Sequence, residues 1–321
     1  MLHPCYHKQK PRGETYLVYS SPDLIKLIHE THALSIWNRK KGPVFWYIAG
    51  VPGPFYVNTE FVIGAETAKD LLKQIDKVLG SLADPGVRSE ALGKIILDAT
   101  TTNSVYQQVI KTMAAKAREN YPVGSYNFIS GGERRDWLFS VPLADELNIK
   151  HAYLFKNQTA YCPQGLIPHE KALHIADLIN NAASYFDLWF PTLEKAKLDY
   201  AGTLCFNSRG NGVQKLHARG TKVVALNSID LGFFEQSRAE KLIDEETLAE
   251  IALYFKSPQE WGRQYLPYDV ALFEVMGMDN KSFERMRSFF SLDPWSMRQT
   301  HEVLFTQVKA AIADRLKHQA A

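Results

Sequence analysis

The sequence predicts an α/β fold, in which a parallel sheet is covered by helices. Between residues 126 and 227, short apolar segments typical of buried strands alternate with segments of helical periodicity. Beyond Asp230 the pattern is helical alone, which predicts a helical extension. We therefore expect an N-terminal unit (1–80), an α/β core (81–235) and a helical C-terminal extension (236–321).

Charge and composition exclude several classes of protein. The 321 residues carry 37 basic and 35 acidic side chains, so the net charge of +2 gives no electrostatic case for nucleic-acid binding. No apolar run approaches the ~20 residues of a bilayer span, and the polar start with Pro4 and Pro11 does not resemble a secretory signal. Cys5, Cys162 and Cys205 lie too far apart in sequence for a disulfide framework or a metal motif. We expect a cytoplasmic protein that binds neither nucleic acid nor membranes.

The N-terminal unit is expected to begin with a frayed tail, residues 1–14, followed by a helix. Ser21-Pro22-Asp23 precedes apolar residues at helical spacing, which is typical of a helix N-terminus. The β-prone segments 44–48 and 55–58 flank Pro and Gly residues, which predicts two short strands around a turn.

Two helices are then expected before the sheet. Residues 65–79 have apolar side chains at helical spacing, and Gly80 is expected to end that helix. The residues Asp84-Pro85-Gly86 predict a break in the chain, and a second helix is expected from about 105 to 121.

The alternating region is expected to place several loops at one edge of the sheet. The predicted strands are 126–130, 151–155, 172–176, 202–206 and 222–227, and the predicted helices are 136–147, 184–197 and 213–219. In the extension, helices are expected at 245–255, 280–290 and 295–317. Because ligands of parallel sheets bind at the carboxyl ends of the strands, the loops after Ser130, Phe155, Ala176 and Phe206 are the candidates for a binding site.

The segment from Ala172 to Ser184 carries the most informative pattern. It combines a buried strand, Asp177 at the end of that strand, and a turn of small and polar residues that leads into a helix. Such a turn exposes backbone N–H groups near a helix N-terminus, which suits a phosphate, and Asp177 would accept hydrogen bonds from sugar hydroxyls. The plain alternative is a strand–loop–helix junction with an N-capping serine.

This segment resembles the ribose-phosphate motif of the type I phosphoribosyltransferases. Asp177 matches the second acidic position of the motif, and Ala176 stands where the first acid usually is. The resemblance implies that the following loop holds the 5-phosphate of phosphoribosyl pyrophosphate (PRPP). The loop residues are Asn180, Asn181, Ala182, Ala183 and Ser184, which replace the usual Thr and Gly.

Four further segments resemble orotate phosphoribosyltransferase, in that family's order, over residues 44–230. Pro54–Asn58 is similar to the strand that contacts the pyrimidine, and Ser130–Asp136 stands at the place of the pyrophosphate loop. Tyr153–Lys156 resembles the strand that precedes the mobile catalytic loop. Cys205–Leu216 resembles a later strand and the loop that follows it, where the family usually carries Asp-Arg and then glycines. The resemblance implies base contacts from Phe55, Tyr56, Asn58 and Arg209.

The chemistry of the family assigns roles to the remaining residues. Displacing pyrophosphate requires groups that stabilise its developing charge. The implied groups are Gly131, Gly132, Arg134, Arg135 and Lys156, together with Mg²⁺ bound mainly through the pyrophosphate of PRPP. Asp177 and Lys156 are the expected catalytic residues, and no protein metal site is expected. The alternatives are a tight turn whose arginines pair with Glu133 or Asp136, and a solvated strand end at Lys156.

The sequence also departs from the family pattern. Residues 157–165, at the place of the mobile loop, contain no Lys or His, Asn207 replaces the usual Asp, and Ser208 stands where the family has Arg. The leading hypothesis is a homodimeric, orotate phosphoribosyltransferase-like enzyme that transfers ribose 5-phosphate from PRPP to a pyrimidine. The departures motivate two alternatives: a non-catalytic regulator that binds PRPP or a nucleotide, and a scaffold that uses the helical extension as an interface.

Overall fold

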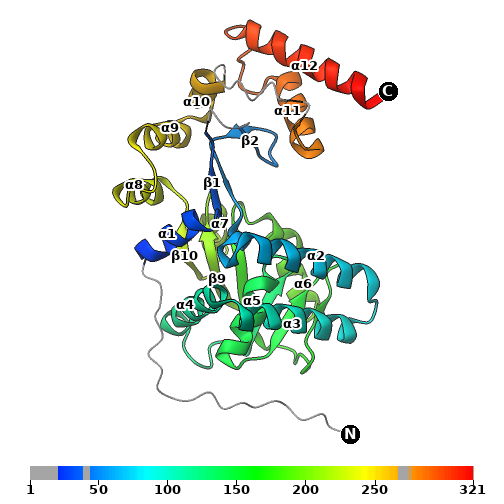
Figure 1. Ribbon diagram of the computed structural model, residues 1–321. Helices are drawn as coiled ribbons and strands as arrows, with labels where there is room; N and C mark the ends of the chain where they lie inside the picture. Colours follow the sequence, from blue (N-terminus) through cyan, green and yellow to red (C-terminus); the bar gives the residue numbers. More distant parts are fainter. Residues whose placement is uncertain (1–20, 39–43, 267–274, 276, 321) are drawn as a thin grey trace.

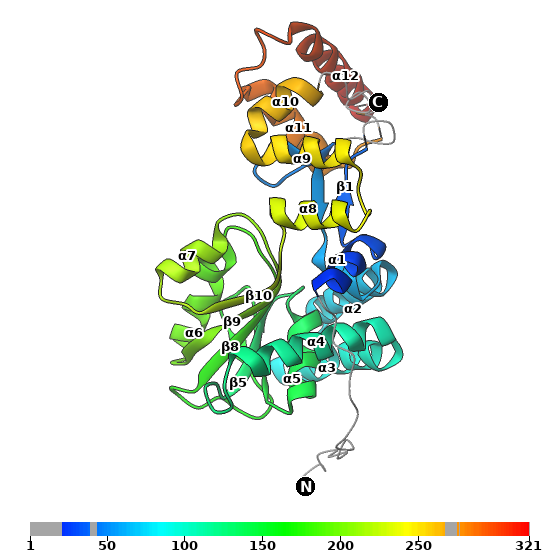
Figure 2. The same cartoon turned by 90° about the vertical axis from the view of Figure 1, so that its left-hand side faces the viewer.

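The computed structural model describes residues 21–38, 44–266, 275 and 277–320, so the expected tail at 1–14 lies outside the described residues. The predicted fold class is confirmed. A mostly parallel sheet lies between two layers of helices, and a group of C-terminal helices lies at one end of the molecule (Figures 1 and 2). None of the described helices has the length and apolar character needed to cross a membrane.

The central sheet has six strands in the order β10-β9-β8-β5-β6-β7. Their bounds are β5 (Phe128–Gly132), β6 (His151–Leu154), β7 (Ala160–Tyr161), β8 (Lys171–Ile179), β9 (Asp199–Ser208) and β10 (Val223–Ser228). All neighbours pair in parallel except β7, which is antiparallel to β6. The five predicted strands are all present, and the unpredicted β7 is too short to show a periodic pattern.

Side chains of the strands alternate between two apolar layers. Leu173 and Ile175 of β8 belong to the cluster that includes α4 (Ser104–Asn120) and α5 (Trp137–Leu147). Ala172 and Ala176 belong to the opposite cluster. The helices on that side are η2 (Tyr185–Trp189), α6 (Phe190–Lys195) and α7 (Gly212–Ala218). Figure 2 shows the two layers on either side of the sheet. The predicted helix 184–197 is therefore two short helices.

One helix before the sheet was not predicted. Helix α2 (Ala65–Ser81) continues through Gly80, which is not the stop that the sequence suggests. The predicted break at Asp84 is present, since α2 ends just before it and α3 (Pro85–Thr102) begins directly after it. The Asp84 side chain accepts a hydrogen bond from the Val87 N–H (2.8 Å), so Asp84 is an N-cap followed by a proline in the first turn of the unpredicted helix.

The N-terminal unit pairs its strands differently from the prediction. It contains α1 (Ser21–Glu30), β1 (Leu34–Ile36), β2 (Phe45–Trp46), β3 (Pro52–Gly53), β4 (Phe55–Val57) and η1 (Thr59–Ile63). The helix at Ser21 is confirmed. Strand β2 pairs with β3 and β4 pairs with β1, so the segments 44–48 and 55–58 do not pair with each other. The hairpin closes earlier than expected, through the Tyr47 N–H to the Val51 carbonyl (3.0 Å).

The C-terminal helices are α8 (Leu231–Ala239), α9 (Glu245–Lys256), α10 (Pro258–Tyr265), α11 (Asn280–Leu292) and α12 (Glu302–Ala320). The buried apolar residues of α8 and α9 belong to the first core, whereas α10, α11 and α12 form a second hydrophobic core with the N-terminal unit. Trp37 and Trp46 pack in this cluster, where Trp46 meets Phe289 with ring centroids 5.5 Å apart. Helix α12 begins later than predicted, because the Asp293 side chain caps a turn through the Met297 N–H (2.8 Å). The three-part division of the chain stays a prediction.

Candidate functional site

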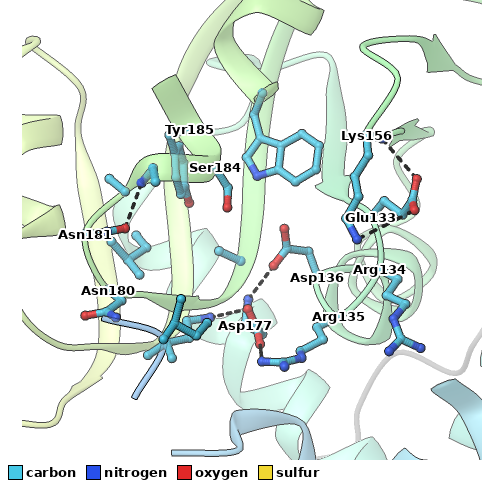
Figure 3. Close-up of a pocket in the computed structure, with 17 residues that line it drawn as sticks. Glu133, Arg134, Arg135, Asp136, Lys156, Asp177, Asn180, Asn181, Ser184 and Tyr185 are labelled. Atoms are coloured by element: carbon cyan, nitrogen blue, oxygen red, sulfur yellow. Dashed lines mark hydrogen bonds and ion pairs between the residues drawn. The ribbon is translucent and has the colours of Figure 1, made fainter. Parts of the chain in front are cut away.

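A cavity of about 480 Å³ lies at the carboxyl edge of the sheet. Its walls come from the loops that follow three neighbouring strands, β6, β5 and β8. The lining residues are Ile48, 133–136, Lys156, 176–185 and Trp189. Figure 3 shows the charged side chains of the first two loops opposite the turn after β8. The sheet thus brings together loops that are far apart in the sequence.

The turn after β8 leaves several backbone N–H groups available. It is anchored by the Gly212 N–H, which donates to the Asn180 carbonyl (2.8 Å), and Ala182 adopts a left-handed conformation with φ of 59°. The Ala183 N–H donates to Oδ1 of Asn181 (3.0 Å). Among the described residues no acceptor takes the N–H groups of Asn181, Ala182 or Ser184. A turn with open N–H groups can hold an anion such as a phosphate.

Asp177 lies at the bottom of the cavity with one oxygen unsatisfied. Its residue is 7% exposed, and Oδ1 accepts a hydrogen bond from the Leu178 N–H (2.6 Å). Oδ2 is buried without a hydrogen-bond donor among the described residues, and Nη1 of Arg135 is 4.0 Å away. Burial raises the pKa of Asp177, and the Arg135 charge opposes that rise. This oxygen is therefore an unused acceptor beside Arg135, covered from solvent in this structure.

Arg135 also pairs with Glu60, a residue of η1 that sequence reasoning missed. Nε of Arg135 lies 3.4 Å from Oε1 of Glu60, whose side chain is only 5% exposed. Burial raises the pKa of Glu60, with Arg135 acting in the opposite direction. Burial lowers the pKa of Arg135, but Glu60 and Asp177 outweigh it and raise that pKa overall. No local sequence pattern marks Glu60 as a residue of the site, because its partner Arg135 lies far away in the sequence.

Asp136 fixes the ends of two strands. Its Oδ2 accepts a hydrogen bond from the Gly132 N–H (3.1 Å) of β5, and its Oδ1 accepts one from the Asp177 N–H (3.0 Å) of β8. Burial, followed by the Asp177 charge, raises the pKa of Asp136 well above its usual range. The His174 ring, 3.8 Å from Oδ2, is neutral because burial lowers its pKa to about 3.

The other predicted pyrophosphate ligands have protein partners. Nη1 of Arg134 lies 2.5 Å from Oδ2 of Asp76 on α2, so this arginine does not pair with Glu133 or Asp136. Nζ of Lys156 lies 3.9 Å from Glu133, which also accepts the Lys156 backbone N–H (3.0 Å). Lys156 remains 58% exposed and is within reach of the cavity (Figure 3).

The two glycines of the predicted pyrophosphate loop belong to β5 and do not line the cavity. A Cβ added to Gly131 would collide with Ser140, and one added to Gly132 would collide with the Trp189 ring and approach Asp136 to 2.8 Å. Both positions therefore need glycine for packing. Their contact with pyrophosphate stays a prediction.

The four residues predicted to contact the base lie outside the cavity lining. Phe55 is 2% exposed and packs on Phe234, with ring centroids 5.0 Å apart. The Arg209 guanidinium lies 5.3 Å from the Phe55 ring and 5.0 Å from the Tyr47 ring. The Tyr56 ring packs at a tilt near those of Phe45 and Tyr47, and the Asn58 N–H donates to the Ala33 carbonyl. Their role in binding a base stays a prediction.

The described residues contain no group of three or more His, Cys, Asp and Glu side chains that could hold a metal ion. The unsatisfied Oδ2 of Asp177 is nevertheless the kind of hard oxygen ligand that Mg²⁺ accepts. One carboxylate oxygen fits a magnesium ion whose other ligands are substrate phosphates and water.

No family model and no curated protein sequence matches the chain. Among solved structures, UMP synthase of Leishmania donovani matches with a TM-score of 0.53 and 13% identity, over 74% of this chain and 42% of that one. Orotate phosphoribosyltransferase of Aeropyrum pernix matches with a TM-score of 0.39 and 15% identity, over 68% of this chain and 98% of that one. The chain thus spans less than half of the UMP synthase. With the parallel sheet and the strand-end cavity described above, the first match identifies the fold of this chain as that of the type I phosphoribosyltransferases.

Proposed function

We propose that the chain is a phosphoribosyltransferase that transfers ribose 5-phosphate from PRPP to an orotate-like pyrimidine and releases pyrophosphate. The observation that carries the proposal is the cavity itself. It joins open N–H groups after β8, an unsatisfied carboxylate oxygen on Asp177 and the cations of two neighbouring loops. These groups are complementary to a phosphate, a ribose diol and a pyrophosphate, respectively.

In the proposed reaction each group has a defined task, and Asp177 has two. The turn Asn180–Ser184 binds the 5-phosphate through backbone N–H groups. Asp177 accepts hydrogen bonds from the ribose hydroxyls and orients the ring. Lys156 and Arg135 stabilise the charge that develops on pyrophosphate as its bond to C1 breaks. Mg²⁺, when bound with PRPP, would neutralise part of that charge, with Asp177 as its protein ligand.

Arg135 has to exchange partners for this to occur. In the structure it lies between Glu60 and Asp177, and both contacts are ion pairs longer than 3 Å, at 3.4 and 4.0 Å. A polyanion in the cavity offers Arg135 a stronger, bidentate partner. Binding of PRPP would then free Asp177 for the ribose.

The test is an assay of pyrophosphate release by the purified protein with Mg²⁺, PRPP and orotate, with the other common bases in parallel. We expect release that depends on both PRPP and a base and falls at least tenfold in Asp177→Asn. Absence of turnover with every common pyrimidine and purine would refute the enzymatic proposal.

A specific observation favours a second candidate, a regulator that binds PRPP or a nucleotide without consuming it. Arg134, Arg135 and Lys156 each have an acidic neighbour, so the cavity offers fewer free positive charges than its sequence suggests. Saturable PRPP binding in calorimetry, with PRPP recovered intact, would support the regulator over the enzyme.

A further inference from the structure

We propose that Asp136 supplies the second carboxyl group of the ribose site, which the strand motif lacks because residue 176 is alanine. This inference rests on the proposed function of the cavity. It assigns a site role to a residue outside the strand motif, on the loop that connects β5 to α5.

The directions of the side chains on β8 place Asp136 on the same face as residue 176. Residues 174 and 176 project from the same face of a strand, because side chains alternate. Ala176 packs in the cluster of α6 and α7, and His174 meets Tyr185 and Trp189 of the same layer. The Asp136 carboxylate lies 3.8 Å from His174, and therefore on the face toward which residue 176 projects.

The small side chain of Ala176 leaves space at the end of β8. Ala176 is 2% exposed and lines the cavity together with Asp136 and Asp177. A larger side chain at position 176 would compete with Asp136 for this position at the end of the strand. Figure 3 shows the Asp136 side chain directed into the cavity, beside the backbone of Asp177. The alanine thus leaves room for a carboxylate from the neighbouring loop.

The Asp136 carboxylate is held in place by two backbone hydrogen bonds. Its two oxygens accept the Gly132 and Asp177 N–H groups, at 3.1 and 3.0 Å, so the carboxylate has one defined position. Each carboxylate oxygen has a second lone pair, which leaves Asp136 able to accept from a ligand in the cavity. Asp177 presents its buried, unsatisfied Oδ2 nearby. Two neighbouring carboxyls at one strand end can bind the two hydroxyls of a ribose.

The test moves the carboxyl from the loop to the strand. Asp136→Ser removes it, and Asp136→Ser combined with Ala176→Asp returns it from position 176. Affinity for PRPP with Mg²⁺ is measured by calorimetry for the full chain, and folding is checked by circular dichroism and thermal melting. The matched control is Asp145→Ser, at an exposed position of α5.

We expect Asp136→Ser to weaken PRPP binding about tenfold or more, and the double variant to return within about threefold of the unchanged protein. The inference is overturned if Asp136→Ser binds PRPP normally, or if the double variant stays as weak as the single one. Should Asp136→Ser fail to fold, Asp136→Asn takes its place, with the same expected loss and with normal binding as the contrary result. Failure of the unchanged protein to bind PRPP would instead refute the proposed function.

Discussion

Arg135 and Glu60 join the N-terminal unit to the floor of the cavity, with Nε of Arg135 3.4 Å from Oε1 of Glu60. Glu60 lies on η1 and Arg135 on the loop after β5, so this ion pair connects the N-terminal unit to the central sheet at the site. Because the Glu60 side chain is 5% exposed and that of Arg135 is 45% exposed, the pair is only partly screened by water.

Replacing Glu60 by Gln should therefore reduce stability by about 1–2 kcal/mol, because it leaves Arg135 with a single distant carboxylate. Urea unfolding measures the effect. The control is Glu66→Gln, which removes an exposed partner of Lys69 and should leave the unfolding midpoint unchanged. Equal midpoints for the two variants would contradict a structural role for the Glu60–Arg135 pair.

Stability should fall on mild acidification because of His29. Burial lowers the pKa of His29 to about 4 from an ordinary 6.5, so the unfolded chain binds a proton that the folded chain does not. The stabilising contribution is complete above pH 6.5 and is lost as the pH falls toward 4. Nε2 of His29 lies 3.0 Å from Oγ of Ser237, and a glutamine at position 29 can keep this hydrogen bond. His29→Gln should therefore reduce the number of protons taken up on unfolding by up to one, as measured by unfolding at several pH values. The exposed control His217→Gln should not reduce it.

Gly132→Ala should destabilise the protein by about 2–3 kcal/mol, because the added methyl group collides with the Trp189 ring. Gly80→Ala is expected to change the stability in the opposite direction. Gly80 lies within α2 with no atom near the added Cβ, so this change should stabilise by about 0.5–1 kcal/mol. Thermal melting distinguishes the signs, and a neutral Gly132→Ala would contradict the packing described for β5.

Lys156→Ala should weaken PRPP binding about threefold to tenfold, because an exposed cation near the cavity contributes a screened attraction to pyrophosphate. The effect should shrink as salt is added. Lys171→Ala is the matched control, since Lys171 is exposed at the start of β8, at the opposite edge of the sheet. Equal losses of PRPP affinity in the two variants would mean that binding responds only to the overall charge of the protein.

Much of the core was predictable because its strands are buried on both faces. Continuous apolar segments such as the one around Ile175 are distinctive, and their alternation with helices specifies a parallel sheet. Helix α3 was not predictable from its first residues, because Asp-Pro-Gly is compatible with both a turn and an N-cap. The choice depends on a hydrogen bond between Asp84 and Val87, which the sequence alone does not reveal.

The candidate site was predictable only in part. Asp177 and the turn after β8 form a continuous segment, so their pattern is visible in the sequence. Glu60 and Asp136 reach the site through tertiary packing, and the arginines take partners from α2 and η1 rather than their sequence neighbours. Such contacts depend on how distant elements meet, which no local spacing specifies.

The proposed function requires that the cavity bind PRPP, which a calorimetric titration measures. The full chain is titrated with PRPP in the presence of Mg²⁺ in a calorimeter, beside Asp177→Asn. We expect saturable binding of one PRPP per chain, weakened at least tenfold by Asp177→Asn. No binding by the unchanged protein, or equal affinity of the two proteins, would contradict it.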